Sequence, residues 1–138
     1  MIARTIKPDV AIVTDVCHDT NTPLVKAHIQ GDVRAGDGPC FTYAPAVHTK
    51  LLDLIIDVAE ENKIPFQRSA SSRSTGTDTD AFAYSNGGVP SALISLPLRY
   101  MHTTVEMAHK DDVENVIKII YKTLLNIENG HDWKYFKV

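Results

Sequence analysis

Apolar residues recur along the chain in two patterns, one typical of strands and one typical of helices. Residues 10–16 are β-branched and nearly all apolar until Thr14 and Asp15, which predicts a strand covered on both faces, as in a parallel sheet. Shorter runs of the same character, bounded by glycine, proline and polar residues, predict further strands. These strands are expected at residues 40–44, 64–71 and 90–98.

Two longer segments carry apolar residues at spacings of three and four, the period of an amphipathic helix. The first covers residues 46–62, and Pro65 prevents it from continuing. The second begins with Asp111 and Asp112, whose charge suits the first turn of a helix. Its apolar stripe consists of Val113, Val116, Ile117, Ile120, Leu124 and Ile127. Residues 18–39 are expected to form an ordered excursion and residues 80–86 a short helix. The tail at residues 131–138 is ambiguous.

Strands that alternate with helices predict an α/β fold, with a mostly parallel sheet between helices in three layers. Residues 1–138 are expected to form a single α/β segment without an internal linker or repeat. In such sheets, binding sites form beyond the carboxyl ends of the strands. Asp15 is predicted to end the first strand and His102 to follow the last one, so both side chains are expected to face one crevice.

The composition narrows the class of protein. A length of 138 residues suits one domain with its own core, and 43% hydrophobic with 22% charged residues is ordinary for a globular protein. A net charge of -3 and a pI near 6.0 argue against a nucleic-acid partner. The two cysteines form no CxxC pair and no secretory leader is visible, which favours a reducing, cytoplasmic location. No apolar run approaches the roughly 20 residues that a membrane-spanning helix needs.

Asp15 and His102 are candidate metal ligands. Carboxylate and imidazole groups that meet in one crevice are the ligands that hold zinc, cobalt or manganese in hydrolases. The alternative is that His102 is a hydrogen-bonded structural residue or a surface group. An acid at the end of an apolar strand needs a partner, and a cation, a cap or a helix N-terminus would each serve for Asp15.

The stretch STGTDTDAF, residues 74–82, suggests a ligand-binding turn. Its spacing does not fit a calcium-binding loop, and it lacks the lysine of a phosphate-binding Walker loop. What remains is a turn rich in backbone donors and hydroxyls that leads into a short helix and would suit a substrate carbonyl or carboxylate. The alternative is a helix N-cap in which Asp78 or Thr79 satisfies the first-turn amides.

Several segments together resemble a known family. IKPDVAIVTDVCHDTNTP, GDGP, IPFQ, GTDTDAF, GGVPSALISLPLRYMHTTVEM and DDVENVIKII are similar, in order and spacing, to the glutamyl or deblocking aminopeptidases. These are dinuclear-metal exopeptidases, and several members carry an endoglucanase label. The similarity runs along essentially the whole chain.

The resemblance implies roles for particular residues. Asp15 would bind one of two divalent metal ions and His102 the other, with zinc, cobalt or manganese as the metal. Gly76, Thr77 and Asp78 would line the crevice on the substrate side. The family more often has a doubled glycine and a single aspartate here, so the substrate role of Asp78 versus Asp80 stays open.

The resemblance also implies that much of the site is missing. Family members supply a histidine ligand from an H-x-D segment, a bridging aspartate and two adjacent glutamates from upstream sequence. No H-x-D occurs here, and Glu60 and Glu61 lie at the end of a helix, so no catalytic base is expected in this chain. The inserted domain that governs oligomer assembly is absent as well. The chain therefore resembles the C-terminal part of the catalytic domain.

Three hypotheses follow. The first is a metal-dependent aminopeptidase that acts on peptides and forms a homo-oligomer at full length, of which this segment is inactive alone. The second is a non-catalytic α/β binding module or a degenerate subunit, motivated by the missing ligands. The third is a glycoside hydrolase, which needs two carboxylates flanking a sugar cleft, here Asp15 and Glu106.

Overall fold

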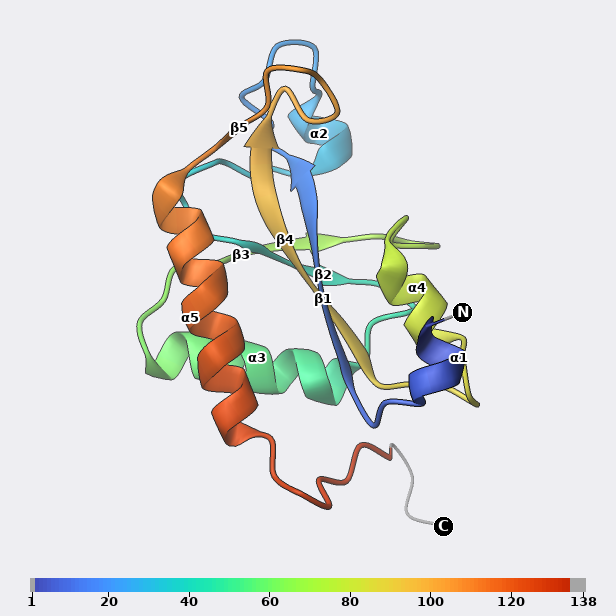
Figure 1. Ribbon diagram of the computed structural model, residues 1–138. Helices are drawn as coiled ribbons and strands as arrows, with labels where there is room; N and C mark the ends of the chain where they lie inside the picture. The colour runs from blue at the N-terminus through green and yellow to red at the C-terminus, as the bar shows by residue number, and fades with distance from the viewer. Residues whose placement is uncertain (1, 135–138) are drawn as a thin grey trace.

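The computed structural model describes residues 2–134, so residues 135–138 of the ambiguous tail lie outside it (Figure 1). A central sheet separates α3 and α5 on one side from α1 and α4 on the other, which gives three layers (Figure 1). This arrangement confirms the predicted α/β class. The elements are α1 (Ile2–Ile6), β1 (Ala11–His18), α2 (Ala27–Gln30), β2 (Cys40–Tyr43), α3 (Thr49–Glu61), β3 (Gln67–Ala70), α4 (Asp78–Ala83), β4 (Ser91–Arg99), β5 (Met107–Ala108) and α5 (Lys110–Asn126).

The sheet has the strand order β1-β4-β2-β3, with β5 paired to the end of β4. β1 and β4 run parallel, in a register that extends from Ala11 opposite Ser91 to His18 opposite Leu98. β2 and β3 are parallel as well, whereas β2 and β5 each pair with β4 in the antiparallel sense. The sheet is therefore mixed. Because β1 and β4 point the same way, their carboxyl ends meet at one edge.

The core lies between α3 and the sheet. Leu51, Leu52 and Ile55 on α3 are fully buried against Phe41 and Ile94 of the strands. Full burial of side chains of this size stabilises the fold by about 1.5–3 kcal/mol each, so this face of α3 anchors the layer. The predicted helix at residues 46–62 is thus confirmed, although it begins at Thr49.

α5 is less well covered than its apolar stripe predicts. Its buried residues are Asp112, Ile119 and Thr123, whereas Ile117 is 62% exposed and Leu124 is 56% exposed. Between α5 and the strands β1 and β4 lies an apolar groove of about 520 Å³. One face of the helix therefore packs on the domain while its apolar stripe borders an open groove.

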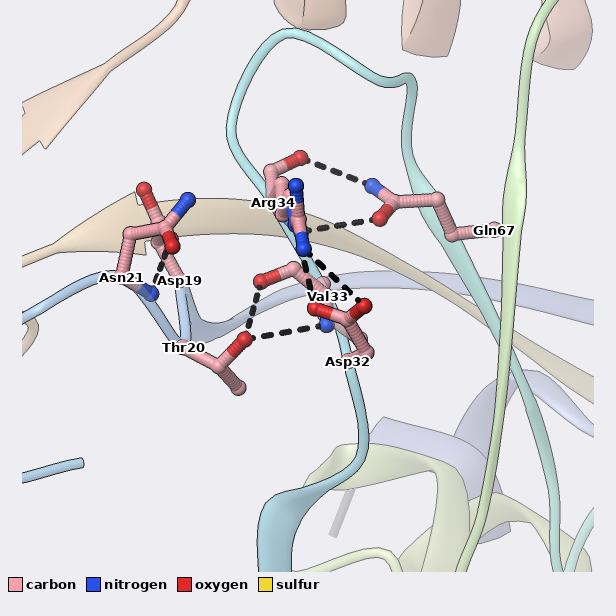
Figure 2. Close-up of polar contacts among 7 residues, drawn as sticks. All are labelled: Asp19, Thr20, Asn21, Asp32, Val33, Arg34 and Gln67. Carbon is pink, nitrogen blue, oxygen red and sulfur yellow. Dashed lines mark hydrogen bonds and ion pairs between the residues drawn. The ribbon is translucent and has the colours of Figure 1, made fainter. Parts of the chain in front are cut away.

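The excursion between β1 and β2 is ordered, as predicted, by hydrogen bonds that join distant residues (Figure 2). The Thr20 hydroxyl donates to the carbonyl of Val33 at 2.9 Å and accepts from its amide at 3.2 Å. The side chain of Gln67 on β3 accepts from the Arg34 amide at 2.8 Å and donates to the carbonyls of Arg34 and Gly38. These bonds fix the chain that leads into β2.

Gly38 and Asp112 fix the end of the same excursion. Gly38 has a positive φ of 96°, and an added Cβ would lie 2.1 Å from the carbonyl oxygen of Pro65, so only glycine fits there. The Asp112 carboxylate accepts from the amides of Gly36 at 2.7 Å and Gly38 at 2.9 Å. The first turn of α5 thereby holds a loop that is distant in sequence.

Three elements were not predicted: α1, α2 and the short β5. Each is short, and none shows a sustained apolar period. Within residues 2–134, no helix combines the length and the apolar character that a membrane span requires.

Candidate functional site

One face of the sheet is polar where β1, β4 and β2 lie side by side. In the strand registers Asp15 lies opposite Ser95, and Ser95 lies opposite Cys40. Paired residues point to the same face, and so does Cys17, two positions after Asp15. β1 continues to His18, so Asp15 lies three residues before the end of the strand rather than at its end.

A polar cavity of about 240 Å³ opens on this face. Its walls come from β1, β2, β3, β4 and the turn before α4, and they include Cys17, Cys40, Ser95 and Thr77. Asp15 is not part of these walls. Asp15, which lies on the edge strand β1, is among the residues that border the apolar groove beside α5. Its Oδ1 accepts from the amide of Val16 at 2.7 Å.

Cys17 and Cys40 are free thiols that both border the polar cavity. A hydrogen bond with Cys17, assisted by one with Ser69, lowers the pKa of Cys40. The same contact, together with burial and the nearby charges of Asp112 and Asp15, raises the pKa of Cys17. Negative charge is therefore more favourable on Cys40 than on Cys17.

His102 lies in the loop between β4 and β5, just beyond the carboxyl end of β4, as predicted. The residue is exposed, its φ is 64°, and its amide donates to the Glu106 carboxylate. Asp15 is about 10 Å before the end of β1, judged from the rise per residue of a strand. Within residues 2–134 neither a hydrogen bond nor an ion pair joins Asp15 to His102. The strand that carries Asp15, β1, and the strand that His102 follows, β4, run toward the same edge of the sheet.

The described residues contain no ready-made cluster of metal ligands. Between residues 2 and 134, no group of three or more histidine, cysteine, aspartate and glutamate side chains is arranged to bind one. A catalytic zinc site needs three protein ligands besides water. Asp15 and His102 would supply one ligand to each of two ions, so the ligand set is incomplete in this part of the chain.

The turn before α4 is organised by its own side chains. The Thr77 hydroxyl caps the helix by accepting from the Thr79 amide at 3.2 Å. The Asp80 carboxylate accepts from the amides of Thr75 at 3.1 Å and Gly76 at 3.0 Å. The cap is therefore Thr77 and not Asp78 or Thr79, and several of the turn's donors are already used. Thr77 borders the polar cavity, whereas Asp78 borders a separate pocket beside α1.

Replacing Thr77 with alanine is expected to destabilise the protein by about 1 kcal/mol, the usual cost of losing an N-cap. Thr77→Ser is the matched control, because serine keeps the capping hydroxyl and should stay near the stability of the unmodified chain. Urea unfolding followed by circular dichroism measures both variants. Equal stability of the alanine and serine variants would show that the cap contributes nothing.

A second cavity, of about 520 Å³, lies near the amino ends of β1 and β4 and includes His48, Tyr84 and Trp133 in its walls. Burial lowers the pKa of His48. None of the residues predicted to form the site borders this cavity.

The sequence analysis did not select Cys17, Cys40 or Ser95, which the fold brings to the polar face. A signal for them exists, because small polar residues at alternate positions of otherwise apolar strands mark one face of a sheet. Finding the face needed the pairing of β4 with both β1 and β2, which a single sequence does not specify.

With this geometry established, similarity to known proteins identifies the family. Residues 1–119 match the sequence profile described as M42 glutamyl aminopeptidase. The chain belongs to this family. Its members are peptidases, and so the resemblance found in the sequence is confirmed.

Individual relatives agree with this assignment. The lysyl aminopeptidase of Pyrococcus furiosus is 38% identical over 114 residues, which are 83% of this chain and 32% of that protein. The crystal structure of a TET aminopeptidase from a marine sediment Thaumarchaeota archaeon superposes with a TM-score of 0.78 at 31% identity, covering 88% of this chain and 34% of that one. A structure described as a putative peptidase/endoglucanase has a TM-score of 0.67 at 32% identity, covering 88% of this chain and 35% of that one.

The chain spans about a third of the length of the curated relatives that it matches. The matched region is the C-terminal part of those proteins. The TET1 peptidase of Pyrococcus horikoshii, whose structure has a TM-score of 0.62 at 26% identity over 89% of this chain and 34% of that one, is described as assembling into a tetrahedron or a large octahedral shell.

Proposed function

We propose that residues 1–138 form the C-terminal part of the catalytic domain of a metal-dependent aminopeptidase, which hydrolyses N-terminal residues from peptides. The observation that carries the proposal is family membership over residues 1–119, which include both candidate ligands. Asp15 and His102 would each bind one of two divalent ions, zinc, cobalt or manganese. Gly76, Thr77 and Asp78 would lie on the substrate side, with Thr77 nearest the polar face.

The remaining metal ligands and the catalytic base would come from polypeptide that corresponds to the preceding part of the relatives. Two open surfaces support this arrangement. β1 pairs on one side only within the described residues, so its outer edge offers unpaired backbone groups to another strand. The exposed apolar stripe of α5 borders the apolar groove beside the same strand. An apolar surface of this kind marks an interaction site.

We also propose an oligomeric state and a cellular location for the completed protein. Because TET peptidases with the same fold form large shells, the completed protein is proposed to be a homo-oligomer. The two free cysteines are consistent with a reducing compartment, for which the cytoplasm is proposed.

An assay of the chain with and without a complementing polypeptide tests the proposed function. The chain is produced alone and together with a polypeptide equivalent to the preceding part of the relatives, and both preparations are given aminoacyl anilides. The chain alone should be inactive, whereas the combined protein should be active, lose activity to a chelator and regain it with zinc, cobalt or manganese.

Other outcomes favour the rival functions. Anilide hydrolysis that is indifferent to the chelator contradicts a metal-dependent aminopeptidase. A combined protein that neither binds metal nor hydrolyses anilides supports a non-catalytic module. Hydrolysis of carboxymethylcellulose that persists in chelator would support a glycosidase, although the Glu106 carboxylate already accepts a hydrogen bond from the His102 amide.

A further inference from the structure

The cavity near the amino ends of β1 and β4 has no part in the proposed peptidase site. It has a volume of about 520 Å³ and is lined by the chain before α3, the end of α4, the loop before β4 and the chain after α5. β4 is 9 residues long, so its amino end lies roughly 26 Å from the carboxyl end that His102 follows. We propose that this cavity binds the planar aromatic ring of a small molecule or of a peptide side chain, of which indole is the representative.

The floor of the cavity is apolar and is fixed by the fold. Ala46, Val47 and Val89 line it and are buried. The amide of His48 donates to the carbonyl of Ser91 at 2.7 Å, which joins the chain before α3 to the start of β4. Sites for small molecules are typically preformed, largely apolar pockets of about 300–1,000 Å³. The cavity has the size and the floor of such a site.

Aromatic rings form its side walls. Trp133 is stacked on His131 with ring centroids 4.3 Å apart, and it meets the ring of His48 edge-on at 6.2 Å. Burial lowers the pKa of His48, so its imidazole is an uncharged part of the wall at neutral pH. Tyr84, at the end of α4, borders the same cavity and is 67% exposed. Aromatic rings pack favourably on one another, so a planar ligand finds partners in Trp133 and Tyr84.

The wall that carries Trp133 is anchored to the rest of the domain. Lys50 Nζ donates to the carbonyl of Lys134, and the Asp132 carboxylate accepts from the Lys134 amide at 3.0 Å. Trp133 itself packs partly against the hydrophobic core. The indole of Trp133 is therefore in place before a ligand enters.

The charges beside the cavity favour a neutral ring over a cation. Aromatic side chains also bind cations through the negative face of the ring, so both kinds of ligand need to be considered. Lys134 lines the cavity and Lys50 is bonded to it, whereas Asp132 is the one acidic residue among the lining residues. Two positive charges against one negative charge repel a bound cation, and a neutral ring is not affected.

The test measures binding to the chain alone, because the cavity consists only of its own residues. Indole is the probe, and saturation-transfer NMR detects it when it is bound. The chain has 1 tryptophan, Trp133, so tryptophan fluorescence reports directly on the cavity. Adding p-cresol should change this fluorescence, and its saturated analogue methylcyclohexanol should bind about threefold more weakly or less, because it lacks the aromatic ring.

Substitutions of Tyr84 separate ring stacking from simple apolar contact. Tyr84→Phe keeps the ring and should bind indole as the unmodified chain does, whereas Tyr84→Leu should bind about threefold more weakly. Trp133→Ala should weaken binding about tenfold. Tyr121→Ala, which removes a tyrosine of α5 that is 61% exposed and lies outside the cavity, is the matched control. Circular dichroism checks folding, and if Trp133→Ala does not fold, the exposed Tyr84 decides.

A second ligand identifies the source of the ring. N-acetyltryptophanamide carries the indole on a peptide backbone, so binding as tight as that of indole assigns the cavity to peptide side chains. Tighter binding of free indole assigns it to small molecules. The proposal is wrong if indole does not bind, if p-cresol and methylcyclohexanol bind equally well, or if Tyr84→Leu keeps the affinity of the unmodified chain.

Discussion

Replacing Asp112 with alanine is expected to lower the free energy of unfolding by about 3 kcal/mol, because two hydrogen bonds to a buried carboxylate are lost. Asp112 is 0% exposed and accepts from the amides of Gly36 and Gly38. The hydrogen bond from the Gly38 amide is buried, so loss of its acceptor leaves a buried donor unsatisfied. The total stability of a domain this size is about 5–15 kcal/mol, so the variant should be visibly less stable.

Urea unfolding of Asp112→Ala beside two controls measures this effect. Asp112→Asn keeps one acceptor oxygen and should be destabilised less. Asp111→Ala removes the neighbouring, exposed carboxylate of the same helix turn and should change the stability by less than about 1 kcal/mol. If the two alanine variants were equally stable, Asp112 would act only as a charge near the helix N-terminus.

Asp111 and Asp112 also show where prediction from sequence stops. The pattern correctly placed both in the first turn of a helix, because that preference is local. It could not distinguish them, because the partners of Asp112 are residues 36 and 38, which are brought close only by the fold. The same holds for Gln67 and Arg34, whose bonds order the excursion.

The elements with long apolar patterns were the predictable ones. The two long helices and the strands β1 and β4 were found because their burial imposes a period on the sequence. Burial itself was overestimated for the edge strand β1 and for α5, since their apolar residues also face the groove. An apolar period predicts that a surface is covered, but it does not say which polypeptide covers it.

Asp15 and His102 stay predictions as metal ligands, based on the strand ends and on the family resemblance, and the structure bears only on where they lie. Asp15 and His102 come near the same edge of the sheet only because β1 and β4 are parallel neighbours, which the structure shows. The place of Cys40 on the polar face depends on β2 joining β4 in the antiparallel sense, which the alternation of strands and helices did not indicate.

Substituting the two candidate ligands in the completed protein is expected to reduce kcat/KM on aminoacyl anilides by more than about 100-fold each, since even loss of a residue that only supports a ligand costs 10–100-fold. The variants are Asp15→Asn and His102→Asn. Asparagine removes the charge at residue 15 with little change of shape. At residue 102 it removes the imidazole, and it tolerates the positive φ of 64° better than alanine does.

A loss of activity identifies a ligand only if the fold and the metal content are measured with it. His102 is exposed in a loop, so His102→Asn should keep the stability of the unmodified protein while losing bound metal. Asp9→Asn and His28→Ala, which change exposed residues of the same types, should keep both activity and metal. A His102→Asn protein with full activity and full metal content would contradict the assignment, because a metal ligand cannot be removed without loss of bound metal.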